Sequence, residues 1–122
     1  MTEGKASWGV QMKRLTIENF RDEIIECARP CLVLFKNKHC GLCDGMISVM
    51  FRIKAAYGSK VKIGYVETTQ EEGLSDMFEI EGVPTLFFFR DGDGVELEYP
   101  ARPDIYSGYS EKHVRDHLDK LL

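Results

Sequence analysis

The sequence predicts an α/β protein with a three-layer α/β/α architecture, in which helices cover both faces of a central mixed sheet. Up to residue 78, short apolar runs alternate with helical patterns, and strands joined by helices run parallel. The next two strand patterns are separated only by Asp91-Gly92-Asp93-Gly94, which is typical of an antiparallel hairpin. We therefore expect one domain with a central sheet of about five strands and about four helices packed against it.

Residues 1–9 are predicted to form a flexible tail, and a single domain is expected over residues 10–122. The domain begins with a short strand at residues 10–15. Thr16 can then cap a helix, which Pro30 ends because proline cannot donate a helical hydrogen bond. The apolar face of this helix is expected to hold Phe20, Ile24, Cys27 and Ala28.

The middle of the chain repeats the alternation of strand and helix. Residues 32–35 form a continuous apolar run, as in a strand that is buried on both faces. A long amphipathic helix is expected at residues 40–57, with Gly58 ending it. A third strand at residues 61–66 and a short helix at residues 71–78 follow.

The last part of the chain predicts a hairpin and a helix. The apolar run at residues 85–89 and the period-two pattern at residues 95–99 are the two hairpin strands. Ser110 can cap a final helix, whose Val114 and Leu118 are expected to face the core.

Length and charge limit the classes of function. At 122 residues the chain can bury about two-thirds of its unfolded surface in one core. Its charges are mixed and its net charge is -4, so the sequence shows no basic patch of the kind that binds nucleic acid or an anionic membrane. No apolar run has the length of a transmembrane helix, and the polar N-terminus lacks the core of a signal peptide. We expect a cytoplasmic monomer, although a leader removed beforehand would leave the same sequence.

Two cysteines lie at the start of the long helix, shortly after the second strand, in the motif Cys40-Gly41-Leu42-Cys43. This position puts the Cys40 sulfur at a helix N-terminus, where free N–H groups and the helix dipole stabilise a thiolate. The thiolate is the form that attacks disulfides, and Cys43, one turn later, can close a ring with it. Zinc sites use the same spacing, but the strand–turn–helix context favours redox chemistry.

Three landmarks in this order resemble the thioredoxin family, over nearly the whole chain from about Val10. They are the Cys40–Cys43 segment, Gly82-Val83-Pro84-Thr85, and Gly108 before the final helix. The resemblance implies the thioredoxin fold, with Pro84 after a cis bond, lying against the sulfurs and excluding a metal. It also implies that Val83, Pro84 and Gly108 line an edge to which an extended substrate peptide binds.

The resemblance implies a mechanism and partners as well. Cys40 is the expected nucleophile, which forms a mixed disulfide with a protein substrate, and Cys43 is expected to resolve it. No cofactor is expected. The electron donor is expected to be a protein such as a thioredoxin reductase, or glutathione.

Several residues around the pair depart from the family pattern. Leu34 stands where the family has a buried acid, and Tyr65 where it has the lysine that partners this acid. Three candidates for the base that deprotonates Cys43 therefore stay open: solvent, the Tyr65 phenol and Glu67. Because the usual acid is absent, we expect resolution of the mixed disulfide to be slow. The segment from residue 99 to 107 is also longer than in a minimal member of the family.

The residues next to and between the cysteines are expected to modulate the site. Gly41 keeps the family pattern, whereas Leu42 replaces a proline or histidine and alters the redox potential. His39 replaces a tryptophan. Two interpretations of His39 stay open: it lowers the pKa of Cys40 and makes the pair more oxidising, or it is an ordinary exposed residue.

Other candidate groups have a structural and a functional interpretation. Cys27 and Cys31 can form a regulatory disulfide, but two small apolar side chains in a core are favoured. His113 and His117 have a spacing that can bind zinc, but a solvated helix face is favoured. No metal site is expected.

The function that the sequence favours is a thiol–disulfide oxidoreductase that reduces protein disulfides. The nearest alternative is an enzyme of the same family that mainly forms or isomerises protein disulfides, because His39, Leu42 and Leu34 depart from the family pattern. A non-enzymatic redox-sensing module bound to one dedicated partner is a second alternative, and a zinc or iron site is the last.

Overall fold

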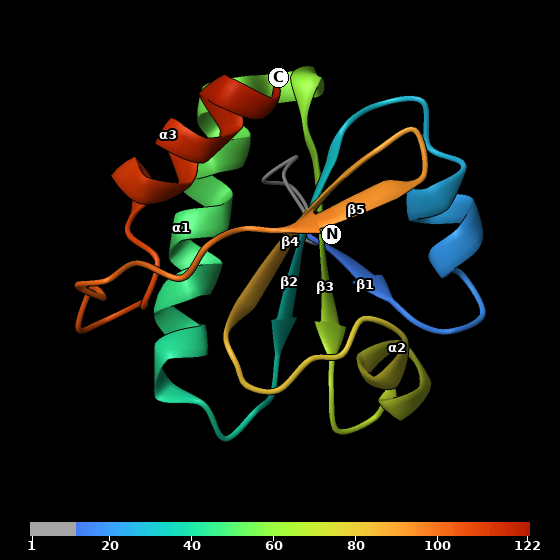
Figure 1. The fold of residues 1–122 in the computed structure, drawn as a ribbon, viewed down its shortest axis with the longest axis horizontal. Helices are drawn as coiled ribbons and strands as arrows, with labels where there is room; N and C mark the ends of the chain where they lie inside the picture. Colours follow the sequence, from blue (N-terminus) through green and yellow to red (C-terminus); the bar gives the residue numbers. More distant parts are fainter. Residues whose placement is uncertain (1–11) are drawn as a thin grey trace, which may run out of the picture.

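The computed structural model describes residues 12–122, so the predicted tail at residues 1–9 lies outside the described residues. Five strands form one sheet in the order β1-β3-β2-β4-β5 (Figure 1). The first three strands in the chain are parallel, and β4 and β5 are antiparallel, as the sequence predicts. The strands are β1 (Lys13–Leu15), β2 (Cys31–Lys36), β3 (Lys62–Glu67), β4 (Thr85–Arg90) and β5 (Asp93–Glu96).

Helices cover both faces of the sheet, which confirms the three-layer α/β/α architecture. The segments are η2 (Arg21–Ile25), α1 (Gly41–Tyr57), the short η3 (Gly58–Lys60), α2 (Glu72–Met77) and α3 (Glu111–Leu121). Helices α1 and α3 lie together on one face, and η2 and α2 lie on the other (Figure 1). No helix within residues 12–122 is both long and apolar enough to cross a bilayer.

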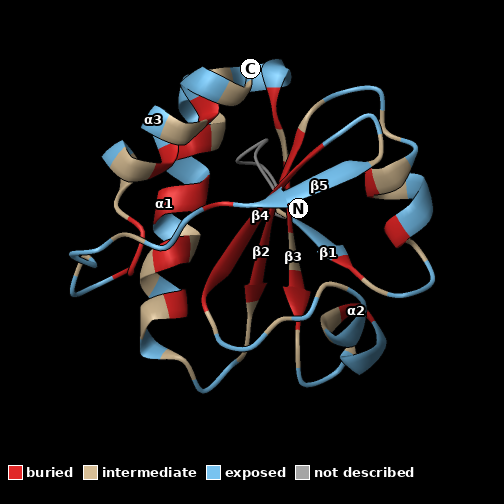
Figure 2. Cartoon of the chain, in the orientation of Figure 1, coloured by how far each residue is buried: buried red, intermediate tan, exposed pale blue. Residues whose placement is uncertain are grey.

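The alternation of side chains along β2 divides the core into two clusters. Leu32 and Leu34 pack under α1 and α3, whereas Cys31, Val33 and Phe35 pack under η2 and α2. All five are fully buried, because this central strand has a helical layer on each side. The central strands are accordingly the most buried part of the ribbon (Figure 2).

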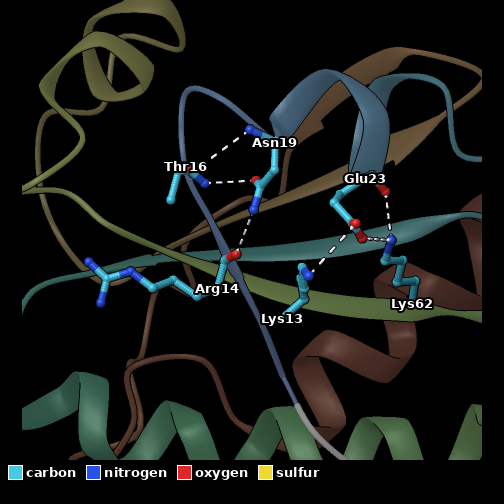
Figure 3. A network of polar contacts seen from close by, with 6 residues as sticks. All are labelled: Lys13, Arg14, Thr16, Asn19, Glu23 and Lys62. Atoms are coloured by element: carbon cyan, nitrogen blue, oxygen red, sulfur yellow. Dashed lines mark hydrogen bonds and ion pairs between the residues drawn. The ribbon is translucent and has the colours of Figure 1, made fainter.

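The first helical segment differs from the prediction. Thr16 caps only the turn at residues 17–19 that leads into η2: the Thr16 N–H donates to Asn19 Oδ1 at 2.8 Å, and the Asn19 N–H donates back to Thr16 Oγ1 at 3.3 Å (Figure 3). The N-cap of η2 itself is Phe20, which makes no side-chain capping hydrogen bond. The segment then widens into a π-helical turn, in which the Glu26 N–H donates to Arg21 O. The segment ends at Ile25, so the helix that was predicted to run to Pro30 is too long. The prediction of one continuous helical face through Ala28 is therefore wrong: Cys27 packs against the core from beyond the end of η2, and Ala28 is exposed.

The hairpin turn is shorter than the predicted Asp91–Gly94 turn. Asp91 and Gly92, with φ of 52° and 84°, form a two-residue turn, and Arg90 pairs with Asp93 across it. Both central residues of such a turn need a positive φ, which Asp-Gly tolerates well. Gly94 therefore belongs to β5, where a Cβ would overlap the Phe89 ring. The strand ends at Glu96, so the predicted strand through residue 99 is too long.

A charge cluster ties η2 to the sheet. Lys62 of β3 donates to the main-chain oxygen of Glu23 at 2.9 Å and to its carboxylate, and the Lys13 ammonium lies 3.8 Å from the other carboxylate oxygen (Figure 3). The hydrogen bond from Lys62 lowers the pKa of Glu23. A lowered folded-state pKa means that this contact stabilises the fold above the ordinary carboxyl pKa of 4.5 and is lost as pH falls through the folded value.

Glu23→Gln is therefore expected to lower the free energy of unfolding by about 1 kcal/mol at pH 7, as for a partly exposed charged hydrogen bond. The difference between variant and wild type is expected to shrink as pH falls below 4.5 and through the lowered folded-state pKa of Glu23, because the wild-type carboxyl is then progressively protonated. Urea denaturation at pH 7 and pH 3 measures both values. An equal difference at the two pH values would contradict the assignment of the stability to the charge.

Candidate active site

The two cysteines of the predicted pair lie at the start of α1, directly beyond the end of β2. Cys40 is the N-cap residue, and its sulfur accepts a hydrogen bond from the Cys43 N–H at 3.2 Å. The two are disulfide-bonded, with their Cα atoms 5.3 Å apart. Cys40 is half-buried and Cys43 is fully buried. An incoming sulfur can therefore reach Cys40, while Cys43 is shielded.

The hydrogen bond to the Cys40 sulfur is what a thiolate at this position would use. The first N–H groups of a helix have no partner within the helix, and here one of them points at sulfur rather than at water. Together with the positive end of the dipole of α1, this donor favours the anionic form of Cys40 once the disulfide is reduced. The local geometry thus activates the more exposed of the two cysteines.

The residues flanking the pair are mainly exposed. The His39 side chain is exposed, and the His39 backbone N–H donates a hydrogen bond to Asn37 Oδ1 at 2.9 Å. An exposed side chain at His39 fits both interpretations of this residue. Gly41 is exposed as well, and Leu42 is half-buried.

Pro84 lies at the same end of the sheet as the cysteines. The Val83–Pro84 peptide bond is cis, Pro84 is buried and Val83 is half-buried. Thr85, the first residue of β4, pairs with Phe35 near the end of the antiparallel β2. This register brings the start of β4 beside the loop that leads from β2 to Cys40.

Gly108 adopts a positive φ of 79°, and a Cβ there would lie 2.8 Å from the Tyr99 hydroxyl oxygen. Its N–H and C=O both pair with Asp104, each at 2.8 Å. The main-chain groups of Gly108 are thus engaged within the extended segment rather than free to pair with a peptide. This is a feature that the family resemblance does not imply.

A buried ion pair near the cysteines was not predicted from the sequence. Lys36 and Glu67 are register partners at the ends of β2 and β3, with Lys36 Nζ 3.6 Å from Glu67 Oε2. Lys36 Nζ also lies 5.6 Å from the centre of the Tyr65 ring. Glu67 is only 6% exposed, and its Oε1 has no hydrogen-bond partner among residues 12–122. The opposite charges at the ends of two parallel strands were the signal that could have found the pair.

The side of the sheet on which this pair lies follows from the strand alternation. Leu34 on β2 and Tyr65 on β3 belong to the cluster under α1, and Lys36 and Glu67 follow them by two residues on the same strands. The pair is therefore on the α1 side of the sheet, at the end where α1 begins with the buried Cys43.

The second cysteine pair lies at the opposite end of β2. Cys31 opens that strand and is fully buried, and Cys27 packs partly buried in the same cluster. Burial raises the pKa of the Cys31 thiol to about 12, and its sulfur donates to Arg29 O at 3.4 Å. A thiol in this state is a poor nucleophile, which agrees with the interpretation of the pair as apolar core.

The two histidines of α3 both contact main-chain oxygens. His113 Nε2 lies 2.7 Å from Glu98 O, and His117 Nδ1 lies 2.9 Å from His113 O. Within residues 12–122, no three histidine, cysteine, aspartate or glutamate side chains are grouped so that they could hold a metal ion. The His113 contact joins α3 to the segment that follows β5, whereas the His117 contact lies within α3.

The fold and the cysteine pair define a class of protein. A cysteine pair at the start of a helix, with one sulfur accessible and the other buried, can exchange electrons with other disulfides. The chain is a thiol–disulfide oxidoreductase. The family model described as Thioredoxin matches residues 11–114. The chain belongs to the thioredoxin family.

Individual relatives support this assignment. The chain is 32% identical over 89 residues to Thioredoxin 1 of Synechococcus elongatus, covering 73% of this chain and 83% of that one. It is 29% identical over 102 residues to Thioredoxin 1 of Nostoc sp., covering 83% and 95%. It is 24% identical over 84 residues, 69% of its own length, to Thioredoxin Y1, chloroplastic, of Arabidopsis thaliana, and spans about half (49%) of that relative.

Proposed function

We propose that this protein reduces disulfides in protein substrates through a mixed disulfide on Cys40. The observation that carries the proposal is the hydrogen bond from the Cys43 N–H to the half-buried Cys40 sulfur at the start of α1. In the reduced protein, the Cys40 thiolate attacks one substrate sulfur. A bond forms between these two sulfurs, the substrate S–S bond breaks, and the other substrate sulfur leaves as a thiolate.

The second step regenerates a disulfide in the protein. Cys43 loses its proton and its sulfur attacks the Cys40 sulfur, which breaks the mixed disulfide and releases the second substrate thiolate. The substrate gains two electrons and the protein is left oxidised, with the Cys40–Cys43 disulfide. A reductase protein or glutathione then returns two electrons. A reducing compartment, which we place in the cytoplasm, suits this cycle.

Glu67 takes the proton from Cys43 in this mechanism. It is a buried carboxylate, one oxygen of which has no hydrogen-bond partner in the described part of the chain, and it lies on the side and at the end of the sheet where α1 begins. A carboxylate accepts a proton at neutral pH far more readily than the phenol of Tyr65 does. The ammonium of Lys36 holds the other carboxylate oxygen and so leaves Oε1 available.

The test is reduction of insulin by the reduced protein, together with its redox equilibrium with glutathione. We expect insulin reduction, and a potential at or below about -250 mV for a reductase. The matched control is a Cys27→Ala/Cys31→Ala variant, which keeps the active pair and is expected to retain both properties. A potential near -120 mV would instead favour an oxidant. Failure to reduce insulin would overturn the proposal and favour a redox-sensing module.

A further inference from the structure

The segment between β5 and α3 carries two exposed apolar side chains beside α1. Ile105 is 79% exposed and Tyr106 is 75% exposed. In Figure 1 this segment is the orange loop that extends past α1, and Figure 2 shows its tip in the exposed colour. Neighbouring exposed apolar residues on a folded surface are a common mark of a contact site for another molecule.

This tip is held in one shape by its own polar groups. Asp104 Oδ1 accepts hydrogen bonds from the N–H groups of Tyr106 at 2.8 Å and Ser107 at 3.2 Å. The two reciprocal bonds between Asp104 and Gly108 close the loop, and the buried Ser107 hydroxyl donates to Tyr109 O at 2.9 Å. The apolar side chains are thus presented on an ordered support, which lowers the entropic cost of binding.

The loop is also fixed to the helix that carries the cysteines. The Tyr106 main-chain oxygen lies so close to Gly45 of α1 that any Cβ at that position would overlap it. Gly45 is five residues after Cys40, which is about 7.5 Å along a helix axis. A protein partner covers about 800 Å² of each surface, a patch with a radius of about 16 Å. A patch of this size centred on Cys40 is wide enough to include a loop that meets α1 at Gly45.

We propose that Ile105 and Tyr106 bind an apolar patch of the protein substrate next to its disulfide, and so help to determine which substrates are reduced. The inference rests on the proposed function, because the substrate must cover the surface around Cys40 for its sulfur to be attacked. An aromatic side chain on a rigid support is the kind of residue that contributes most to binding. A small disulfide lacks the protein surface that would cover the loop while its sulfur is attacked at Cys40.

The experiment compares insulin with the small disulfide 5,5′-dithiobis(2-nitrobenzoic acid). An Ile105→Ser/Tyr106→Ser variant is expected to lose about tenfold in kcat/KM for insulin, mainly through KM, with the rate on the small disulfide unchanged within about twofold. Asp104→Ala keeps both apolar side chains but releases the loop, and is expected to raise KM for insulin less strongly. The matched control is Val95→Ser, which removes a 48% exposed apolar side chain from β5 and is expected to change neither rate.

The outcomes separate this inference from the proposed function. Unchanged insulin kinetics, or an equal loss on both disulfides, would overturn the docking role. A change from dimer to monomer in the double variant, measured by sedimentation, would show that a second copy covers the loop and would also overturn it. A wild-type protein that reduces neither disulfide would overturn the proposed function and this inference with it.

Discussion

Cys40→Ser is expected to abolish disulfide reduction, whereas Cys43→Ser is expected to stop the reaction at the mixed disulfide. The half-buried Cys40 sulfur is the one that a substrate can reach, and it alone accepts the hydrogen bond at the helix N-terminus. Its removal should lower the rate by at least about 10³-fold, as removal of a nucleophile does in other enzymes. Cys43 is buried and acts only after the first bond has formed.

Reduction of insulin measures the loss, and mass spectrometry of the Cys43→Ser protein after incubation with insulin measures the trapped adduct. The Cys40→Ser protein is the control for trapping, and is expected to give no adduct. An adduct on Cys43 of Cys40→Ser that forms as fast as the one on Cys40 would reverse the assigned order of the two sulfurs. Many trapped partners from a cell extract would indicate a general reductase, and one dominant partner a dedicated module.

Glu67→Gln is expected to slow resolution of the mixed disulfide by about 10- to 100-fold at pH 7. The amide keeps the size of the side chain but cannot accept the proton of Cys43. Resolution must then depend on hydroxide, so its rate should rise with pH over the range 6–9 with a slope near one on logarithmic axes. Stopped-flow measurement of the release of the second substrate thiol gives this profile for variant and wild type.

Asp44→Asn is the matched control for the Glu67 experiment. Asp44 follows Cys43 in the first turn of α1 and is exposed, so its replacement removes a nearby negative charge without removing a buried acceptor. It is expected to leave the pH profile unchanged. Equal slowing in both variants would show that charge near the dithiol, rather than proton transfer to Glu67, sets the rate. Thermal unfolding of Glu67→Gln separates a loss of stability from a loss of rate.

The succession of strands along the chain and their parallel or antiparallel directions could be predicted because they depend on local patterns. Apolar runs alternating with helical periods specify parallel strands, and the Asp91-Gly92 turn specifies a hairpin. The boundaries were less predictable. The π-helical turn in η2 depends on how Phe20 and Ile24 pack on the sheet, and the end of β5 at Glu96 depends on its pairing with β4.

A cysteine that caps a helix is reactive because of its own neighbours in the chain, so the local sequence specifies the chemistry of this site. The groups that surround that cysteine depend instead on tertiary contacts. Lys36 meets Glu67 because two strands pair in one register, and the loop carrying Tyr106 reaches Gly45 because glycine leaves room between segments far apart in the chain. Such contacts join residues that no local pattern relates, so they required the folded structure.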